Sequence, residues 1–262
     1  MHFKRWIFAF LLSISCFANE TPFLGTSIPK SGTHLLMKLL NFLTECKPTG
    51  SWNGSLTKTQ MEELLLNLNS KKLYSFSHAN EPYYLDFAQS QPEYIKLIQI
   101  RDLRDTLISA VFHFDSELEK LGIKSFEDRL TFILTSDTVC TLWVKNNANT
   151  IMKWISLPNA FVIRFEDLVG EKGQGSEEKQ RETIQFISSL LNIRLTQDRL
   201  DWIVDHLFGG DPRERVSWTF RRGQIGDWKK YFQPHHRVLF NQLWGAYQQA
   251  LGYPLCEIEE GT

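Results

Sequence analysis

The chain has 262 residues, 42% of them hydrophobic, which is enough for one large domain with a buried core. Its 29 basic and 30 acidic residues give a net charge of −1, so no overall positive field points to nucleic acid, and an anionic ligand would need a local cluster of cations. Aromatic residues make up 13%, and the sequence has no internal repeat or low-complexity tract, which argues against disorder.

The N-terminus has the three parts of a secretory signal peptide. Two basic residues precede an apolar run, and small residues follow up to Ala18. The apolar run is shorter than the ~20 residues that a membrane span needs. We therefore expect residues 1–18 to be a signal peptide or an apolar leader, and residues 19–262 to form a single domain. Cleavage after Ala18, a lipoprotein-type signal at Cys16 and an apolar lead-in docked on the core all fit this pattern.

The first predicted strand, residues 21–29, leads directly into a predicted helix. The strand is short, partly apolar and bounded by two prolines. From Gly32 onward, leucines at positions 35, 36, 39, 40 and 43 recur at helical spacing. The turn between the two elements, PKSGT at residues 29–33, therefore presents free backbone N–H groups and the positive end of a helix.

This turn resembles a phosphate-binding P-loop in which the residues are reordered. The P-loop has the sequence G-x-x-x-x-G-K-[ST]. Here Pro29 stands where the second glycine should be, and Gly32 follows the Lys-Ser pair. Backbone N–H groups around Gly32, the charge of Lys30 and the hydroxyls of Ser31 and Thr33 together would hold a phosphate. The alternative is an ordinary strand-to-helix turn with a solvent-facing lysine.

Strands and helices alternate along the rest of the chain. This alternation predicts an α/β fold, a P-loop-like three-layer sandwich with a central, mostly parallel sheet flanked by helices. No linker marks a second domain. Strands are predicted at residues 71–78, 94–102 and 160–168, the last two of them buried; helices at 60–69, 103–114, 126–155, within 177–207 and at 234–251; and a long loop at 208–232.

Three of the predicted strands end in residues that can bind phosphate. Ligands of open parallel sheets bind beyond the carboxyl ends of the strands. The PKSGT turn, His78 and Arg101 all stand at such ends. Arg101 can grip a phosphate with two hydrogen bonds, and Ser109 on the following helix can share it. The alternative is a local ion pair of Arg101 with Asp102 or Asp105.

The long loop carries a second cationic segment. Arg221 and Arg222 are followed directly by Gly223, a composition that suits a loop closing over an anion. Asp227 and Trp228 would anchor its far end. The alternative is a solvated basic surface loop.

Taken in this order, the three segments resemble the PAPS-dependent sulfotransferases of the cytosolic type. PKSGT resembles that family's 5′-phosphosulfate loop, IRDLRDTLISAVFHF (100–114) its 3′-phosphate segment, and FRRGQIGDW (220–228) its cofactor clamp. The resemblance extends from about Pro22 to Tyr253. It implies that PAPS binds as sulfonate donor and 3′,5′-ADP leaves as product. The cofactor-binding residues would be Lys30, Ser31, Gly32, Thr33, His34, Arg101, Ser109, Arg221, Arg222 and Gly223.

The resemblance also implies a mechanism without a metal. A sulfonate group moves from PAPS to a hydroxyl or amine of a small-molecule or lipid acceptor. By position, His78 is the general base, and Lys30 stabilises the charge that develops on the bridging oxygen of the leaving 3′,5′-ADP. We expect no nucleic-acid partner, and we expect contact with a membrane only through the leader if it is retained. The chain could also form a homodimer.

The sequence departs from the family's pattern at three places. The family usually has Thr-Thr-Trp where this chain has Thr33-His34-Leu35, so an imidazole replaces a hydroxyl and an aromatic surface for adenine is missing. Phe76 stands where the family often has a lysine, and Phe165 where it commonly has a tyrosine near the adenine. These departures predict weaker cofactor binding.

The remaining histidines and the cysteines give no metal-binding signal. We expect His113 to pack or face solvent, and His235 and His236 to lie on the surface at the start of the last helix. The four cysteines are far apart in the sequence and form no CxxC motif.

Two other functions remain open from the sequence. A nucleotide kinase would need the standard P-loop and a Mg²⁺-binding aspartate, and Asp102 does follow a buried strand. An exported, catalytically degenerate protein of the same fold would bind a ligand without turnover. The leader points to export or a secretory compartment, whereas the family resemblance points to the cytoplasm, where PAPS is made.

The acceptor would bind in loops that differ among members of the family. Their aromatic side chains, including Trp52, Tyr83 and Tyr84, suit a phenolic, steroid-like or lipid acceptor, and would serve equally well in the core. These loops are residues 49–57, 79–86 and 115–126.

Overall fold

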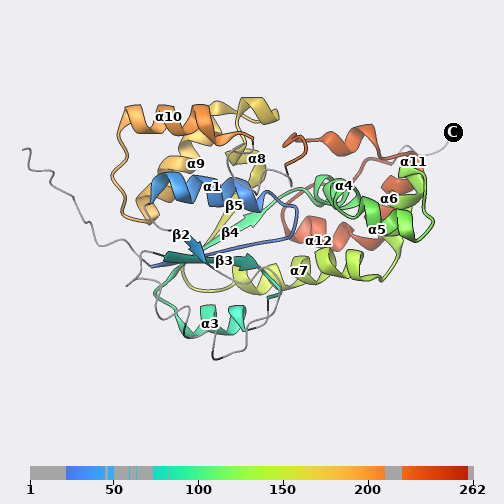
Figure 1. The fold of residues 1–262 in the computed structure, drawn as a ribbon, viewed down its shortest axis with the longest axis horizontal. Coiled ribbons are helices and arrows are strands. Elements are labelled where there is room, and N and C mark those ends of the chain that lie inside the picture. The colour runs from blue at the N-terminus through green and yellow to red at the C-terminus, as the bar shows by residue number, and fades with distance from the viewer. Residues whose placement is uncertain are drawn as a thin grey trace, which may run out of the picture.

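The structure is a computed structural model whose ribbon is shown in Figure 1. It describes residues 22–44, 47–49, 59, 63, 73–81, 83–209 and 220–258. The predicted leader lies outside the described residues. So does the helix predicted at residues 60–69, except for Glu63, which is helical.

The described strands form one parallel sheet in the order β2-β3-β1-β4-β5. Its central strand β1 (Phe23–Ser27) pairs in parallel with β3 (Leu73–His78) on one side and β4 (Ile95–Ile100) on the other. The edge strands, β2 (Lys47–Thr49) and β5 (Ala160–Arg164), are also parallel to their neighbours. The predicted α/β fold with a parallel sheet is confirmed.

Helices cover both faces of the sheet (Figure 1). One face carries α1 (Thr33–Leu43), α8 (Phe165–Leu168), α9 (Glu177–Leu190) and α10 (Gln197–Leu207). The opposite face carries α3 (Tyr84–Ser90) and α7 (Val139–Ile155). Beyond the carboxyl ends of the strands lie α4 (Leu103–His113), α5 (Asp115–Lys120), α6 (Phe126–Thr135), the 3₁₀ helix η4 (Asp227–Lys230), α11 (Pro234–Leu243) and α12 (Gly245–Ala250).

Two hydrophobic cores sandwich the sheet because strand side chains alternate between its faces. Phe23 and Leu97 point into the core under α1, α9 and α10, whereas Leu24 and Ile98 point into the core that includes α7. Central strands of this kind are buried on both sides, which accounts for the unbroken apolar run of β4. The strand predicted as buried at residues 160–168 is shorter and lies at an edge of the described sheet. It ends at Arg164, residues 165–168 form α8, and Val162 is 38% exposed.

Two predicted long helices are each divided. The helix expected at 126–155 breaks between α6 and α7, where Ser136 is extended and its hydroxyl bonds the side chains of Thr138 and Thr141. Hydrogen bonds made locally by such hydroxyls compete with the backbone hydrogen bonds of a continuous helix. The helix expected at 234–251 breaks at Trp244, whose indole N–H donates to the carbonyl of Leu134 3.0 Å away. The tertiary contact thus overrides the helical periodicity.

Several short elements were not predicted from the sequence. Strand β2 lies between the first predicted helix and the helix predicted at residues 60–69, α3 begins in the predicted acceptor loop 79–86, α5 lies in the predicted acceptor loop 115–126, and η4 lies in the predicted loop 208–232. Elements of three to seven residues are too short to show a periodic pattern. None of the helices in the described part of the chain has the length and apolar character that crossing a lipid bilayer requires.

Candidate active site

The turn between β1 and α1 is held in a shape that only a glycine permits at one position. Gly32 has φ +96°, in the left-handed region. A Cβ at this position would lie 2.5 Å from Cδ2 of Phe165. Gly32 is also the N-cap of α1, so the first turn of the helix begins here. The backbone therefore presents a helix N-terminus at this turn, which is the feature that the sequence predicts for anion binding.

The hydroxyl of Ser31 is committed to the protein itself. Its Oγ donates to the carbonyl of Ile28 at 2.7 Å and lies 3.2 Å from the carbonyl of Gln99. Ser31 is fully buried. In the structure this hydroxyl ties the turn to β4.

Lys30 supplies the positive charge of the turn. Burial lowers the pKa of Lys30 to about 8, and no acidic group among the described residues acts against this shift. The ammonium group thus stands partly desolvated and without a carboxylate partner in the described part of the chain. Such a group gains most from an incoming anion.

His78 lies at the end of β3, directly beside the end of β1. Ser27 and His78 are partners in the strand register. The Nδ1 atom of His78 is 3.3 Å from Oγ of Ser27, and that hydroxyl is 2.7 Å from Oγ1 of Thr33 in the turn. The ring also meets Trp143 of α7 edge-on, with centroids 5.4 Å apart.

Several basic groups converge around His78. Burial lowers its pKa to about 4, and the charges of His34, Lys30 and His113 add to this effect. Desolvation and then the Lys30 charge lower the pKa of His34 to about 4, although part of this side chain is exposed at the surface. His113, expected to pack or face solvent, stacks on Trp143 at 5.6 Å, and burial and Lys30 lower its pKa. All three imidazoles are therefore neutral near pH 7.

Arg101 forms a second cationic group at the end of β4. Its guanidinium lies 4.1 Å from the centroid of the Phe165 ring, the same ring that adjoins Gly32. Nη2 donates to the carbonyl of Gln224 at 2.6 Å and is 3.6 Å from Oδ2 of Asp105. The ion pair considered from sequence does exist, but the Nε–H remains buried with no partner among the described residues. Phe165 thus contacts Arg101 and adjoins the turn at Gly32.

In the cationic loop, residues 220–228, both arginines form ion pairs with the same carboxylate, that of Asp227. Arg221 and Arg222 lie 2.5 and 3.5 Å from Asp227, which also pairs with Lys230 at 3.0 Å. The Arg221 guanidinium covers the ring of Phe112, with its Nε–H buried and unpaired among the described residues. Arg222 is half-exposed.

The loop is docked from two sides. Asp105 of α4 accepts hydrogen bonds from the N–H groups of Gly226 and Trp228 at 2.7 and 2.9 Å. On the other side, the N–H of Ile225 donates to the carbonyl of Gly173 at 3.0 Å. Gly223 has φ +61°. The loop is thus held beside Arg101.

The other sequence-predicted residues lie as follows. Ser109 is half-buried on α4, the helix that follows Arg101. Tyr84 is fully buried with its hydroxyl 2.9 Å from the carbonyl of Gly25, so it belongs to the core and lines no acceptor loop. Tyr83 is exposed, and Trp52 lies outside the described residues.

His236 corrects a further expectation. It was expected on the surface, but it is fully buried, accepts from the N–H of Gln233 at 3.1 Å and contacts Oγ1 of Thr131 at 3.0 Å. His235 is exposed as expected. No group of three or more metal-binding side chains occurs among the described residues.

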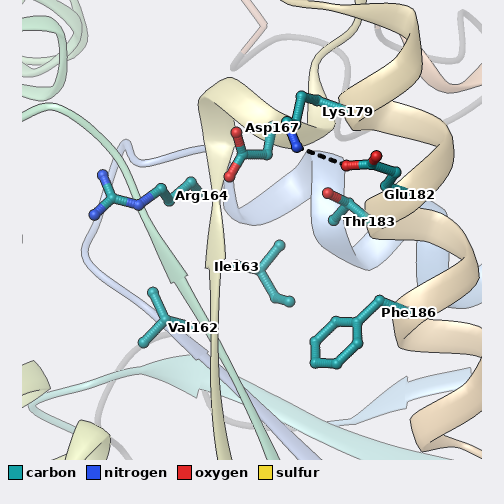
Figure 2. A pocket seen from close by; sticks show the side chains of 8 residues that line it. All are labelled: Val162, Ile163, Arg164, Asp167, Lys179, Glu182, Thr183 and Phe186. Carbon is teal, nitrogen blue, oxygen red and sulfur yellow. Dashed lines mark hydrogen bonds and ion pairs between the residues drawn. The ribbon is translucent and has the colours of Figure 1, made fainter.

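A surface hollow of about 240 Å³ lies elsewhere, between β5 and α9 (Figure 2). Lys179 and Glu182, both on α9, pair at 2.7 Å, and Phe186 lies below them in the view of Figure 2. None of the predicted cofactor-binding residues lines it. The convergence of Lys30, His78 and Arg101 is therefore a separate site.

Comparisons with known proteins give one consistent result. The family model of the sulfotransferase domain matches residues 20–251. The 3-alpha-hydroxysteroid and 3-beta-hydroxysteroid sulfotransferases of Cavia porcellus are 21% and 22% identical over alignments of 257 and 256 positions, and the alignments cover 86% of this chain and 82% of each relative. The crystal structure of mouse sulfotransferase SULT7A1 complexed with PAP superposes with a TM-score of 0.64 at 19% identity, covering 89% of both chains, and so supports the fold.

Proposed function

Because the chain belongs to the sulfotransferase family, we propose that it transfers a sulfonate group from PAPS to a hydroxyl or amine of an acceptor, with His78 as general base. One observation carries the proposal. Within the described part of the chain, Arg101 and Arg221 each keep a buried Nε–H without a partner, and Lys30 has no carboxylate partner. Buried donors without acceptors are costly, so these groups favour an anionic ligand.

The positions of these cations favour an anion with two separate charged groups. Lys30 and the first turn of α1 stand on the Gly32 side of the Phe165 ring, and Arg101 lies against the same ring. PAPS has a 5′-phosphosulfate and a 3′-phosphate. We assign the first to Lys30 with the backbone N–H groups of the turn, and the second to Arg101, Ser109 and the loop arginines.

The chemistry assigned to this chain's residues is positioning and proton transfer. His78 accepts the proton of the acceptor hydroxyl or amine as that oxygen or nitrogen bonds to sulfur. Lys30 and the N–H groups of the turn stabilise the negative charge that stays on the departing 5′-phosphate when its bond to sulfur breaks. The lowered pKa of His78 keeps the imidazole unprotonated and available as a base at neutral pH.

The departures from the family's pattern have structural counterparts. Phe76 is fully buried against Gly25, so it brings no cation to the reacting atoms. His34 replaces a hydroxyl with an imidazole whose pKa is lowered to about 4, so it is a neutral hydrogen-bonding group at pH 7. Phe165 offers Arg101 a ring face without a hydroxyl. Binding of the donor then depends mainly on Lys30, Arg101 and the turn.

The test is transfer of labelled sulfonate from PAPS to a panel of phenols, steroids, lipids and amines. We expect transfer by the wild type and its loss in His78→Ala, while binding of 3′,5′-ADP is retained. His235→Ala is the matched control, because this histidine is exposed and distant from Lys30 in the fold. Tighter binding of ATP with magnesium than of 3′,5′-ADP would favour a kinase, and equal inertness of wild type and His78→Ala would favour a binding protein.

A further inference from the structure

A short chain of hydrogen-bonding groups lies behind His78. Ser27 ends β1, and its Oγ is 3.3 Å from Nδ1 of His78 and 2.7 Å from Oγ1 of Thr33. Ser27 is fully buried and Thr33 nearly so. The three groups connect the imidazole to the turn that carries Lys30.

The hydroxyl of Ser27 can serve either neutral tautomer of His78, because a hydroxyl both donates and accepts. It donates to Nδ1 when the imidazole hydrogen is on Nε2, and it accepts from Nδ1 when the hydrogen is on Nδ1. The second arrangement leaves the Ser27 hydrogen for Oγ1 of Thr33, 2.7 Å away, so that one chain of donors runs from the imidazole to the turn. It also leaves the lone pair of the imidazole on Nε2.

We propose that Ser27 is a positioning residue that holds neutral His78 with its hydrogen on Nδ1 and its lone pair on Nε2. The Nδ1–H group donates to Ser27, whose hydroxyl then donates to Oγ1 of Thr33. The hydrogen of the Thr33 hydroxyl remains for a ligand oxygen. A base that accepts a proton at Nε2 needs this tautomer, because the other tautomer carries a hydrogen at that nitrogen.

The same chain of groups couples the base to the anion-binding turn. When Nε2 takes up a proton, the ring becomes a cation and its Nδ1–H a stronger donor. Ser27 then becomes a stronger donor to Thr33, and Thr33 to the ligand oxygen, because successive hydrogen bonds polarise one another. Ser27 itself gains and loses no proton overall. This catalytic consequence rests on the proposed sulfonate transfer, whereas the tautomer does not.

The neighbouring strand residue provides a matched control. The hydroxyl of Thr26 is buried and has no partner among the described residues. Because side chains alternate along a strand, Thr26 points to the opposite face from Ser27. Thr26→Val therefore removes a buried hydroxyl from the same strand without touching the chain of groups behind His78.

The decisive measurement is the ¹⁵N NMR spectrum of the imidazoles in the full chain, with His78 assigned by its loss in His78→Gln. We expect the Nδ1–H tautomer in the wild type, a mixture or the Nε2–H form in Ser27→Ala, recovery in Ser27→Thr, and no change in Thr26→Val. An Nε2–H tautomer in the wild type overturns the proposal without any variant. So does a Ser27→Ala spectrum identical to that of the wild type.

Kinetics provide the second measurement. Loss of a hydrogen-bond partner behind a functional histidine usually costs about 10- to 100-fold, so kcat of Ser27→Ala should fall in that range and recover in Ser27→Thr. The dissociation constant of 3′,5′-ADP should change by no more than about threefold. A wild-type kcat in Ser27→Ala contradicts the positioning role. If the tautomers are as expected but no sulfonate is transferred, the proposed function fails and the tautomer assignment stands.

Discussion

The guanidinium of Arg101 lies over the ring of Phe165, 4.1 Å from its centroid, and the same ring adjoins Gly32, where an added Cβ would lie 2.5 Å from Cδ2 of Phe165. A single aromatic side chain on α8 thus sets the spacing between the two cationic elements of the site. Its position follows from β5, which ends at Arg164 immediately before it. The geometry of the site therefore depends on an edge strand that supplies no charged group to it.

Gly32→Ala should abolish nucleotide binding and destabilise the protein. A non-glycine residue at φ +96° costs about 1–2 kcal/mol, and the added Cβ would also collide with Phe165 at 2.5 Å. Thermal unfolding and calorimetry with 3′,5′-ADP measure the two effects. Gly122→Ala is the matched control, because Gly122 has φ +79° but open space around it. It should lose stability of the same order and bind nucleotide normally; equal binding defects in both variants would contradict the steric explanation.

Arg101→Lys should weaken binding of 3′,5′-ADP by about 1.5–3 kcal/mol, the range for a hydrogen bond to a charged group. Lysine keeps the charge but loses the Nε–H and the planar stack on Phe165. Calorimetry with 3′,5′-ADP and with 5′-AMP makes the test specific, because only the first has a 3′-phosphate. An equal loss for both ligands would show that Arg101 does not hold that phosphate. Arg181→Lys, at the surface pair with Glu177, is the control.

The pH dependence of kcat/KM should lack an acid limb near pH 6.5. The pKa of His78 is lowered to about 4 by burial and by His34, Lys30 and His113, so the base stays unprotonated until the pH approaches that value. Activity should instead fall above about pH 8, where Lys30 loses its proton and its charge. This prediction concerns the free enzyme, which kcat/KM reports.

Lys30→Arg tests the alkaline limb of this profile. Arginine stays protonated throughout the range, so any activity that remains should no longer fall near pH 8. An acid limb near pH 6.5 in the wild type, or an unchanged alkaline limb in Lys30→Arg, would contradict the assignment.

Asp105→Ala should release the cationic loop. This carboxylate accepts from Gly226 and Trp228 and pairs with Arg101, and breaking a buried network of this kind costs about 3–5 kcal/mol. Hydrogen exchange should accelerate at the Gly226 and Trp228 amides, and 3′,5′-ADP should bind more weakly. Asp201→Ala, in an exposed network with Arg181, should leave both quantities as they are. Unchanged amide protection in Asp105→Ala would show that other contacts dock the loop.

The core of the fold and the outline of the site follow from local patterns. The leucine spacing after Gly32 predicts α1, and the apolar run ending at Ile100 predicts a strand buried on both faces. The polar residues at the ends of these strands had to meet at one edge of the sheet, as Lys30, His78 and Arg101 do. These features depend on hydrophobic periodicity and on the parallel pairing of strands. Both can be predicted from each segment of the sequence by itself.

The rest depends on contacts between segments far apart in the chain. The hydroxyl of Ser31 is bonded to Gln99 and Ile28, and nothing in PKSGT distinguishes that role from a ligand contact. Trp143 comes to His78 from a helix 65 residues further along, with no motif to mark it. His236 is buried because Thr131 offers it a partner. Ser27 has no motif either, and it meets His78 because β1 and β3 pair in register.

The docking of the cationic loop limits which substitutions homologous sequences can accept at two positions. The carbonyl of Gly173 receives the N–H of Ile225, and a Cβ on Gly173 would lie 2.6 Å from the carbonyl oxygen of Gly223. Two glycines 50 positions apart therefore share one small volume of space. In an alignment of homologues, positions 173 and 223 should co-vary, with a larger residue at the first accompanied by a shifted or lengthened segment at the second.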